Sequence, residues 1–553
     1  MTFGRTTTGP SVGAVGQQGS ARVDVFLAMV LVAVATLPWI GGLGFYSDDW
    51  VFLSQYDQAS SQTWGGFFDA THTANTGGRP VQVAWQSGLY ALFGTNLLAL
   101  HIVNTAVLAL AAAALMLLLR QVAPRPVAVA IAAVFATMAH YSTVRFWFAS
   151  NQAALAGLFC FISGYCLARS LKTDRRPVLS FLASIVALVV TTLSYEIFLT
   201  STVVFGLAGL WYAGRNRRGA AWMPIAYLAA LGATLVVKQV ISERTATTDG
   251  VVARTVWLAR NQVLALIVDF VDLGLLLPVL VLRRLIAGDI PLVGVIIAIA
   301  LSAIGGWWLR AALVDSDAPS RRLGVQLIIG GTLFAIAARS IYLVTAKSWQ
   351  VTALGLANRV DYAPALGIAG AFIGFAIVAS RSERVLPAIV AAIVLFQLLT
   401  VSLIGEQWKD ASVRQEALLA NLRSDLPQLT DESTVILDTC TAVGGAPTFD
   451  AYWAVKGALQ RTTGLSNING DVLSEEVTVT DADLKILVYG DEIVYPWDDD
   501  LILYAWPARE VTILSDAAAF SESSAGCPTT RAGLGSPVLN GPMDWLFEYR
   551  YGS

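Results

Sequence analysis

The sequence predicts a polytopic α-helical membrane protein that ends in a small polar domain of α/β or mostly β type. The chain has 553 residues, of which 56% are apolar and only 14% are charged, and its mean hydropathy is +0.62. Soluble domains carry about 25% charged residues. Apolar runs recur up to residue 405 and then stop. Sixteen tryptophans and sixteen tyrosines are typical of aromatic rings anchored at both membrane interfaces.

The apolar runs define a transmembrane domain, which we place at residues 23–405. A membrane-spanning helix needs about 20 apolar residues, so the runs predict about eleven spans. The third run is short and is expected to extend in both directions. The runs cover residues 24–44, 98–118, 127–139, 150–168, 178–194, 197–213, 221–240, 291–309, 323–343, 362–380 and 385–405.

Three further parts flank the transmembrane domain. Residues 1–22 are rich in Gly, Ser and Thr, which predicts a disordered cytoplasmic tail. Residues 406–428 carry leucines at helical spacing, which predicts a connecting amphipathic helix. Residues 429–553 contain short β-prone runs between Gly, Asp and Pro, which predicts a soluble extracytoplasmic domain. The leucines are Leu418, Leu419, Leu422 and Leu426, and the β-prone runs are 434–437, 484–489, 501–504 and 510–514.

Basic residues set the predicted orientation, because short loops rich in Lys and Arg stay in the cytoplasm. The first loop on the opposite side, 45–97, contains only Arg79 as a basic residue. We therefore expect a multi-pass protein of the plasma membrane with a cytoplasmic N-terminus and an extracytoplasmic C-terminal domain. The basic loops contain Arg120, Arg125, Arg169, Lys172, Arg175, Arg176, Arg215, Arg217, Arg218, Arg310, Arg321, Arg322, Arg381 and Arg384.

The apolar stretch 258–282 leaves two interpretations open. If it spans the membrane once, every later loop changes side and the C-terminal domain becomes cytoplasmic. If it is re-entrant or lies along the outer interface, the basic loops stay inside, and we prefer this second interpretation. Asp269, Asp272 and Pro278 suit a kinked, partly wet element. Its cost is an outer position for the basic pair at 283–284.

Charge and cysteine usage narrow the partners. A net charge of −3 provides no basic field for nucleic acid, so no nucleic-acid partner is expected, whereas contact with membrane lipids is. Cys440 and Cys527 form a disulfide candidate if their domain is extracytoplasmic. The other two cysteines lie in an apolar run and are expected to be inert. With three histidines and no C-x-x-C motif, a zinc site is not expected.

Asp48 and Asp49 follow the first apolar run, where a membrane helix should emerge into water. Ionisable groups at such a boundary are costly and usually functional. One of the two is therefore a candidate catalytic base, with a slight preference for Asp48. The alternative interpretation is that they cap a helix or solvate a loop.

Several short motifs resemble one family. The motifs are Gly78-Arg79-Pro80-Val81, then 89–94 with an aromatic-Gly turn, then His101-x-x-Asn104, then Leu193-Ser194-Tyr195-Glu196, and Asn358-Arg359-Val360-Asp361-Tyr362-Ala363-Pro364. Together with the aspartate pair, their order resembles the C-type (GT-C) superfamily of membrane glycosyltransferases. Within it, the pattern is most similar to bacterial relatives of protein O-mannosyltransferases, over roughly residues 40–410.

The chain also departs from that pattern. It has no tetratricopeptide repeats, Tyr195 stands where lysine is usual, and the expected Gly-Arg motif is displaced to residues 141–145. These departures bear on the sugar and the acceptor rather than on the reaction type.

The resemblance implies a polyprenyl-phosphate-linked sugar donor and direct inverting transfer to a hydroxyl. Asp48 or Asp49 would be the base, and Glu196 would contact the acceptor or pair with an arginine. Arginine matches phosphate oxygens bidentately, so Arg79 and Arg359 are the first donor-phosphate candidates. The family also implies a possible Mg²⁺ or Mn²⁺ ion near Asp48 and Asp49, although two carboxylates are few for a hard cation.

Weaker candidates have ordinary interpretations beside the functional ones. The further phosphate candidates are Arg145 and Lys347, and all the arginines could instead snorkel to the interface. The acceptor or sugar-binding candidates are His72, Tyr195, Trp147 and Tyr362. Aromatic residues here also suit an interfacial belt, and His101 with Asn104 suits a core hydrogen bond.

The leading hypothesis is a glycosyltransferase acting on a cell-envelope glycan, a lipid or an exported protein. The main rival is a transporter or flippase of a lipid-linked sugar, which would need inverted repeats and broken helices near the midplane. A third hypothesis is a non-catalytic scaffold displayed through the C-terminal domain. Chemical turnover of the donor separates the first from the other two.

Overall fold

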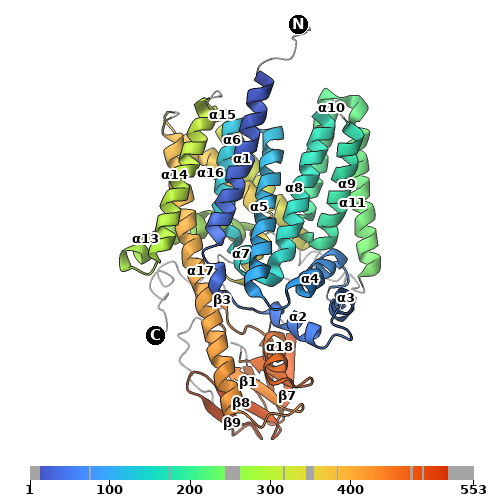
Figure 1. Cartoon of the computed structure of the whole chain (residues 1–553), viewed down its shortest axis with the longest axis vertical. Helices are drawn as coiled ribbons and strands as arrows, with labels where there is room; N and C mark the ends of the chain where they lie inside the picture. The colour runs from blue at the N-terminus through green and yellow to red at the C-terminus, as the bar shows by residue number, and fades with distance from the viewer. Residues whose placement is uncertain are drawn as a thin grey trace.

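The helices of the first 400 residues run side by side in a bundle, and the C-terminal domain lies beyond one end of it (Figure 1). We call this end of the bundle the domain end. Helix α1 (Gly13–Thr36) begins at the opposite end. The computed structural model describes residues 13–73, 76–172, 176–242, 259, 262–314, 318–343, 354–382, 384–473, 477–488 and 491–520.

Each of the expected apolar runs forms a helix, which confirms the polytopic helical fold. In the described part of the chain, ten helices are long and apolar enough to cross a membrane, and the bent pair Arg125–Thr137 and Ala139–Phe146 gives one more. One of the ten is the stretch Gln262–Ala287, outside the expected runs, whereas the run 362–380 forms the shorter apolar helix α16 (Ala365–Ala379). The other runs form α1 (Gly13–Thr36), α5 (Leu97–Val122), α6 (Arg125–Thr137), α8 (Asn151–Lys172), α9 (Pro177–Ser194), α10 (Leu199–Asn216), α11 (Trp222–Ile241), α14 (Leu292–Val314), α15 (Arg321–Arg339) and α17 (Leu386–Asp425). Helix α1 already begins at Gly13, inside the expected tail.

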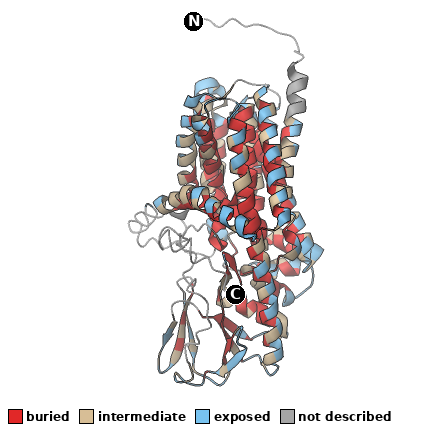
Figure 2. Cartoon of the chain, turned by 90° about the vertical axis from the view of Figure 1, so that its left-hand side faces the viewer, coloured by how far each residue is buried: buried red, intermediate tan, exposed pale blue. Residues whose placement is uncertain are grey.

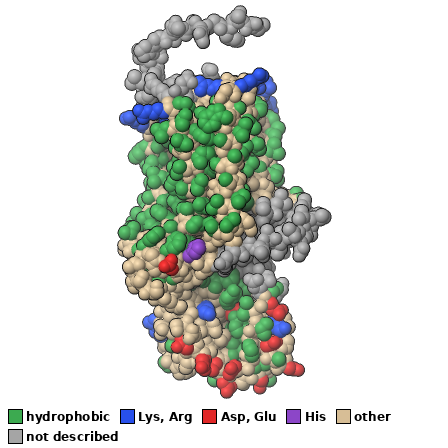
Figure 3. All heavy atoms as spheres, turned by 90° about the vertical axis from the view of Figure 1, so that its right-hand side faces the viewer, with side chains coloured by type: hydrophobic (Ala, Val, Ile, Leu, Met, Phe, Trp, Pro, Cys, Tyr) green, Lys and Arg blue, Asp and Glu red, His purple; other side chains and the backbone are tan. Residues whose placement is uncertain are grey.

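Burial separates the bundle interior from its outer wall (Figure 2). All residues from Pro126 to Thr137 of α6 are buried, as expected of a central helix that is apolar on every side. Large apolar side chains are exposed on the outside, for example Leu182 and Val186 on α9 and Val240 on α11. Figure 3 shows this apolar wall with Lys and Arg gathered at the end away from the domain. The wall therefore suits contact with lipid.

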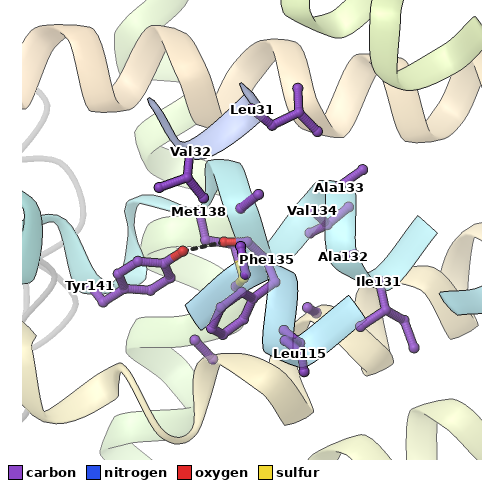
Figure 4. Close-up of a cluster of buried hydrophobic side chains, with 14 of the residues drawn as sticks. Leu31, Val32, Leu115, Ile131, Ala132, Ala133, Val134, Phe135, Met138 and Tyr141 are labelled. Carbon is purple, nitrogen blue, oxygen red and sulfur yellow. Dashed lines mark hydrogen bonds between the residues drawn. The ribbon is translucent and has the colours of Figure 1, made fainter. Parts of the chain in front are cut away.

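At the bend after α6, a side chain from the following segment donates a hydrogen bond to a backbone carbonyl of α6. Helix α6 ends at Thr137, and the short elements η2 (Ala139–Tyr141) and α7 (Ser142–Phe146) continue at 55° to it. The Tyr141 hydroxyl returns to donate a hydrogen bond to the Phe135 carbonyl, inside the apolar cluster drawn in Figure 4. A backbone carbonyl freed inside an apolar bundle needs such a partner.

The stretch 262–287 returns to the end of the bundle from which it starts. It holds the π-helical element η6 (Val268–Leu276) and α13 (Leu277–Ala287). Before it, α11 ends with Lys238 bonded to Glu196 at the domain end. After it, α14 begins at the domain end, because Trp308 near its far end bonds to Asp24 of α1 at 2.8 Å. Although its length and composition would suit a span, this path favours the re-entrant or interfacial interpretation.

Short helices of the loops collect at the domain end. In the first loop these are α2 (Asp48–Asp57), α3 (Trp64–Thr71) and α4 (Pro80–Phe93). Further short elements at this end include η1 (Ile40–Gly42), η3 (Phe148–Ser150), η4 (Glu196–Phe198) and η8 (Leu356–Asp361). The long helices are interrupted at this end by short elements, and most of the candidate residues lie here.

The C-terminal domain combines small β-sheets with helices, which confirms the predicted small domain of α/β or mostly β type. Its main sheet has the order β4-β1-β8-β9, with β9 antiparallel to β8 and the other pairs parallel. Alternate residues of β1 face opposite layers: Val435 and Leu437 pack with α17 and α18 (Tyr452–Thr463), while Ile436 packs against the second sheet β5-β6-β7. The strands are β1 (Thr434–Asp438), β2 (Ala442–Val443), β3 (Ala446–Pro447), β4 (Asn469–Val472), β5 (Val477–Val479), β6 (Asp483–Val488), β7 (Asp491–Pro496), β8 (Leu501–Ala505) and β9 (Glu510–Ile513).

The expected connecting helix is not a separate element. Helix α17 runs without a break for 40 residues, from Leu386 to Asp425. The predicted boundary at residue 405 therefore falls inside one helix. The predicted leucine face is present, since Leu418 and Leu422 lie in the core of the C-terminal domain. The apolar half packs in the bundle, and the amphipathic half forms one wall of the domain.

Candidate functional site at the domain end

Asp48 and Asp49 begin α2, and they point to different surroundings. Asp49 is buried, and its Oδ2 accepts a hydrogen bond of 3.0 Å from the Tyr46 backbone N–H. This bond ties Asp49, in the first turn of α2, to the residue just before the N-cap residue, Ser47. Asp48 is only half-buried. Asp49 therefore has a structural contact at the start of α2, whereas Asp48 is the more accessible carboxylate of the two.

Electrostatics separate the two aspartates further. Burial raises the pKa of Asp49 well above its usual range, and the nearby Asp48 charge adds to this despite the hydrogen bond from Tyr46. The neutral acid is thus the favoured form of Asp49. A base must be ionised to accept a proton, so Asp48 is the better candidate of the pair.

Glu196 is the centre of the ion pairs at this end. It accepts hydrogen bonds from Nε (2.9 Å) and Nη2 of Arg79, and from Nζ of Lys238 (3.0 Å). The three side chains are 25%, 20% and 18% exposed for Arg79, Glu196 and Lys238. Glu196 therefore has the arginine partner that the sequence allowed for, and it joins the first loop to η4 and α11.

Tyr195 lies between the two arginines predicted to bind phosphate. The Arg79 guanidinium lies over its ring at 4.7 Å from the centroid, and Arg359 Nε donates to its hydroxyl at 3.4 Å. Arg359 also lies over the Trp147 ring at 4.8 Å and donates through Nη1 to the Leu356 carbonyl at 2.9 Å. Stacking holds a guanidinium in place while leaving other donors for an anion.

The charge of Asp48 reaches this group. Burial lowers the pKa of Arg79, but Glu196, and more weakly Tyr195 and Asp48, raise it, and the net shift is upward. Arg79 therefore stays fully charged. We define the charged cluster as the set Asp48, Arg79, Glu196, Lys238 and Arg359 with the rings of Trp147 and Tyr195.

The structure places other candidates away from the charged cluster. Arg145 is buried inside the bundle and donates to Thr36, the Ala136 carbonyl and Tyr141. Tyr362 is buried among aromatic rings that include Tyr141 and Phe198. His72 is exposed at the end of α3 and stacks on Phe68. Lys347 lies outside the described residues.

Asn104 and His101 lie within the bundle, near the domain end of α5. Asn104 donates to the Val144 carbonyl at 2.9 Å, which is the core hydrogen bond expected of it. The ring nitrogens of buried His101 have no hydrogen-bond partner among the described residues.

The cysteines follow the predicted division. Cys160 and Cys166 are free, and Cys160 is buried. Cys440 is disulfide-bonded. Its predicted partner, Cys527, lies outside the described residues, so this pairing stays a prediction.

The C-terminal domain covers the outer face of α2. Ser47 donates to Asp450 at 3.0 Å, and Arg461 of α18 forms an ion pair with Asp57. A Cβ added at Gly457 of α18 would lie 2.5 Å from the Trp50 carbonyl oxygen. The two helices thus touch backbone to backbone, directly behind the aspartate pair.

The described residues near Asp48 and Asp49 do not supply a ligand set for a divalent cation. Asp49 accepts the Tyr46 N–H through Oδ2, and no group of three His, Cys, Asp or Glu side chains converges on a metal-sized site within the described ranges. A hard cation needs about six oxygen ligands. We therefore assign no role to Mg²⁺ or Mn²⁺.

Lys238 is the member of the charged cluster that the sequence analysis missed. It stands near the end of the apolar helix α11, on the side otherwise poor in Lys and Arg. A lone cation in that position was the available signal.

No known family model matches the chain, and no curated protein matches it.

Proposed function

We propose that this protein is a GT-C-like membrane glycosyltransferase that moves a sugar from a polyprenyl-phosphate donor to an acceptor hydroxyl. The acceptor would be a cell-envelope glycan, a lipid or an exported protein. The charged cluster carries this proposal, because three cations from three separate elements gather beside two carboxylates at one end of a membrane bundle. Such a group suits a phosphate attached to a lipid tail.

The proposed reaction is one displacement at the anomeric carbon. The acceptor oxygen forms the new bond to that carbon as the bond to the donor phosphate oxygen breaks, which inverts the configuration. The acceptor proton passes to the Asp48 carboxylate. The leaving group is the polyprenyl phosphate, which carries away the electron pair of the broken bond.

The cations of the charged cluster would stabilise the leaving phosphate. Glu196 engages Nε and Nη2 of Arg79, so we assign the remaining Nη1 group to the phosphate. Arg359, stacked on Trp147, supplies a second guanidinium. Donors placed where charge develops lower the barrier without reorganising during the reaction. Glu196 acts here as a positioning residue for Arg79 and Lys238.

We place the charged cluster on the extracytoplasmic side of the plasma membrane. The support is the concentration of Lys and Arg at the opposite end of the bundle (Figure 3), since basic loops stay in the cytoplasm. Gln58 at the domain end and Asn216 at the far end are both exposed. In intact cells a membrane-impermeant thiol reagent should label Gln58→Cys and not Asn216→Cys. Labelling in the reverse pattern would contradict this orientation.

The function is tested by reconstituting the full chain in liposomes with a radiolabelled polyprenyl-phospho-sugar and a cell-envelope fraction as acceptor. We expect the labelled sugar to appear in the acceptor and an equimolar amount of free polyprenyl phosphate to be released. Both products should be lost in Arg359→Gln. Movement of intact donor across the bilayer without its cleavage would instead support the flippase. If the donor is neither cleaved nor moved across the bilayer, the result would support the scaffold hypothesis.

A further inference from the structure

A second group of charges lies inside the bundle near the domain end. Arg339, at the end of α15, donates through Nη2 to Asp269 of η6, and through Nη2 (2.8 Å) and Nε (3.2 Å) to Oδ1 of Asp361 of η8. All three side chains are at most 2% exposed. We call Arg339, Asp269 and Asp361 the buried triad. It joins three segments that are far apart in the sequence.

The charges of the buried triad do not balance when all three groups are ionised. One guanidinium faces two carboxylates, which leaves one negative charge in an apolar interior. Oδ1 of Asp269 and Oδ2 of Asp361 are buried and have no hydrogen-bond partner among the described residues. An uncompensated buried charge is strongly unfavourable, and a carboxyl group in this position takes up a proton instead.

The surroundings of the buried triad offer no second cation within the described residues. From η2, His140 Nε2 contacts the Asp269 backbone carbonyl at 3.2 Å, and its Nδ1 has no hydrogen-bond partner there. From η6, Asp272 is a further buried carboxyl that has contacts of its own. From α16, Phe372 presents an apolar ring to His140. Arg359 on η8 is engaged by Tyr195 and Trp147.

We propose that the buried triad binds one exchangeable proton, and that this proton holds η8 in the position in which Arg359 faces the charged cluster. The proton belongs on Oδ2 of Asp361, because Oδ1 of that residue already accepts both bonds from Arg339. Burial raises the pKa of Asp361, Arg339 lowers it, and the charge of Asp269 raises it further. The net effect is a pKa of about 8. The site is therefore occupied at neutral pH and empties above about 8.

The link from the proton to Arg359 is short. Arg359 and Asp361 belong to the same six-residue element, η8 (Leu356–Asp361). Asn358 anchors one side of it, since its Oδ1 accepts from Ser142 (3.1 Å) and from the Thr143 backbone (3.3 Å). Asp361 anchors the other side through Arg339. Loss of the proton adds a negative charge at this second anchor, so η8 and Arg359 would shift as the carboxylates repel one another. This half of the inference rests on the proposed function.

The proton is tested directly by infrared spectroscopy of the purified full chain in nanodiscs. A protonated carboxyl group absorbs infrared light at a different frequency from a carboxylate. Its band shifts in heavy water when the proton exchanges for deuterium. In the unaltered protein we expect one such band that is present below a pH of about 8 and lost above it, distinct from the band of Asp49, which also favours its neutral form. Asp361→Asn and Asp269→Asn should each lack it, because one carboxylate then balances Arg339. The matched control is Asp289→Asn, since Asp289 pairs with Arg284 at the same end but is 33% exposed.

The titration of the unaltered chain decides the proton even where a variant does not fold. Absence of a titrating band in it, or a band retained in both triad variants, would overturn the proposal. The positioning role is tested by the affinity for polyprenyl phosphate. It should fall as the pH rises through about 8 in the unaltered protein and in Asp289→Asn, but stay level in Asp361→Asn. A parallel fall in Asp361→Asn would refute the positioning role alone. No binding at any pH, beside a titrating band, would refute the proposed function alone.

Discussion

Asp48 and Asp49 are adjacent in the sequence, yet the start of α2 assigns them different work. Successive residues of a helix point about 100° apart. One carboxyl is therefore turned inward to the Tyr46 N–H, and the other is left half-buried near Arg79. The inward one is favoured in its neutral form and the outward one is available as a base.

Isosteric amides should separate the two roles. Asp48→Asn removes the proposed base, so the proposed sugar transfer should fall by about 10²–10⁴-fold. Asp49→Asn keeps an oxygen for the Tyr46 N–H and resembles the neutral acid, so most activity should remain. Initial rates of transfer from a labelled donor measure both. Equal losses in the two variants would contradict the division of roles.

Lys238 should contribute to donor affinity through its charge. Lys238→Met keeps the length of the side chain but removes the cation beside Glu196, so binding of polyprenyl phosphate should weaken by roughly tenfold, about 1.4 kcal/mol. Lys409→Met is the matched control, because Lys409 is a half-buried lysine paired with Glu406. Equilibrium binding of the lipid phosphate to both variants checks this. Equal affinities would remove Lys238 from the phosphate site.

At this scale the sequence predicted charged residues better than it predicted their contacts. Arg79, Glu196 and Arg359 were candidates because short motifs carry them, and they meet in the charged cluster. Lys238 was missed because one lysine in an apolar run resembles an ordinary interfacial anchor. Arg145 had the right chemistry, but its position depends on the bend after α6, which sequence pattern does not specify.

The element that organises the domain end is α2, since it contacts both the bundle and α18. Trp147 of the bundle donates to the Tyr46 carbonyl at 2.9 Å just before α2. On the other side Trp50 packs near Phe449 of the domain. The helix is held between two large bodies, so its position depends on close fits on both sides.

A methyl group at Gly457 should separate α18 from α2. Gly457→Ala would place a Cβ 2.5 Å from the Trp50 carbonyl oxygen, and such overpacking costs about 1–3 kcal/mol. Gly232→Ala in α11 has no atom within 4 Å of the new Cβ, and it should stabilise its helix by about 1 kcal/mol. Thermal unfolding and protease cleavage between α17 and α18 compare the variants. A Gly457→Ala protein as stable as Gly232→Ala would show that the fit is loose.

Elements with long patterns were predictable, and short ones were less so. Each spanning run became a helix because about 20 apolar residues exclude most alternatives. The strands β1, β6, β8 and β9 were found from β-branched runs. Strand β4 was missed because Asn469-Gly470-Asp471 resembles a turn, and only its pairing with β1 makes it a strand.

At the scale of the whole molecule, the C-terminal domain is tied together by buried polar contacts as well as by its core. Asp471 of β4 is buried and accepts from the Tyr495 hydroxyl of the second sheet and from the Val472 N–H, both at 2.8 Å. Burial raises its pKa to about 6, although both hydrogen bonds lower it. This carboxyl connects the two sheets.

The pH dependence of domain stability follows from that shift. The folded pKa of Asp471, about 6, exceeds the unfolded value of about 4. Its stabilising contribution is therefore complete below about 4 and is lost as the pH rises through about 6, by about 3 kcal/mol in all. Amide exchange of β4 in the full chain, corrected for intrinsic rates, should show this loss. Asp471→Asn should not show it, and an unchanged profile would contradict the assignment.

The global arrangement was only partly accessible from the sequence. The basic loops and the parity of the spans indicated which loops share an end, and the path of 262–287 agrees with that ordering. The seating of the domain on α2 was not predicted, because contacts such as Ser47 with Asp450 join residues 403 apart. Such pairs leave no local pattern in either segment.

Helix α17 gives the C-terminal domain a rigid mount. Its 40 residues extend about 60 Å, roughly twice the thickness of a bilayer's hydrocarbon core. The domain is joined to the bundle by this helix and by its contacts with α2. Anything it binds is presented beside Asp48 at one height and in one orientation. The effective molarity at the site of a ligand bound to the domain would be set by this mount. A flexible linker would instead impose an orientational search.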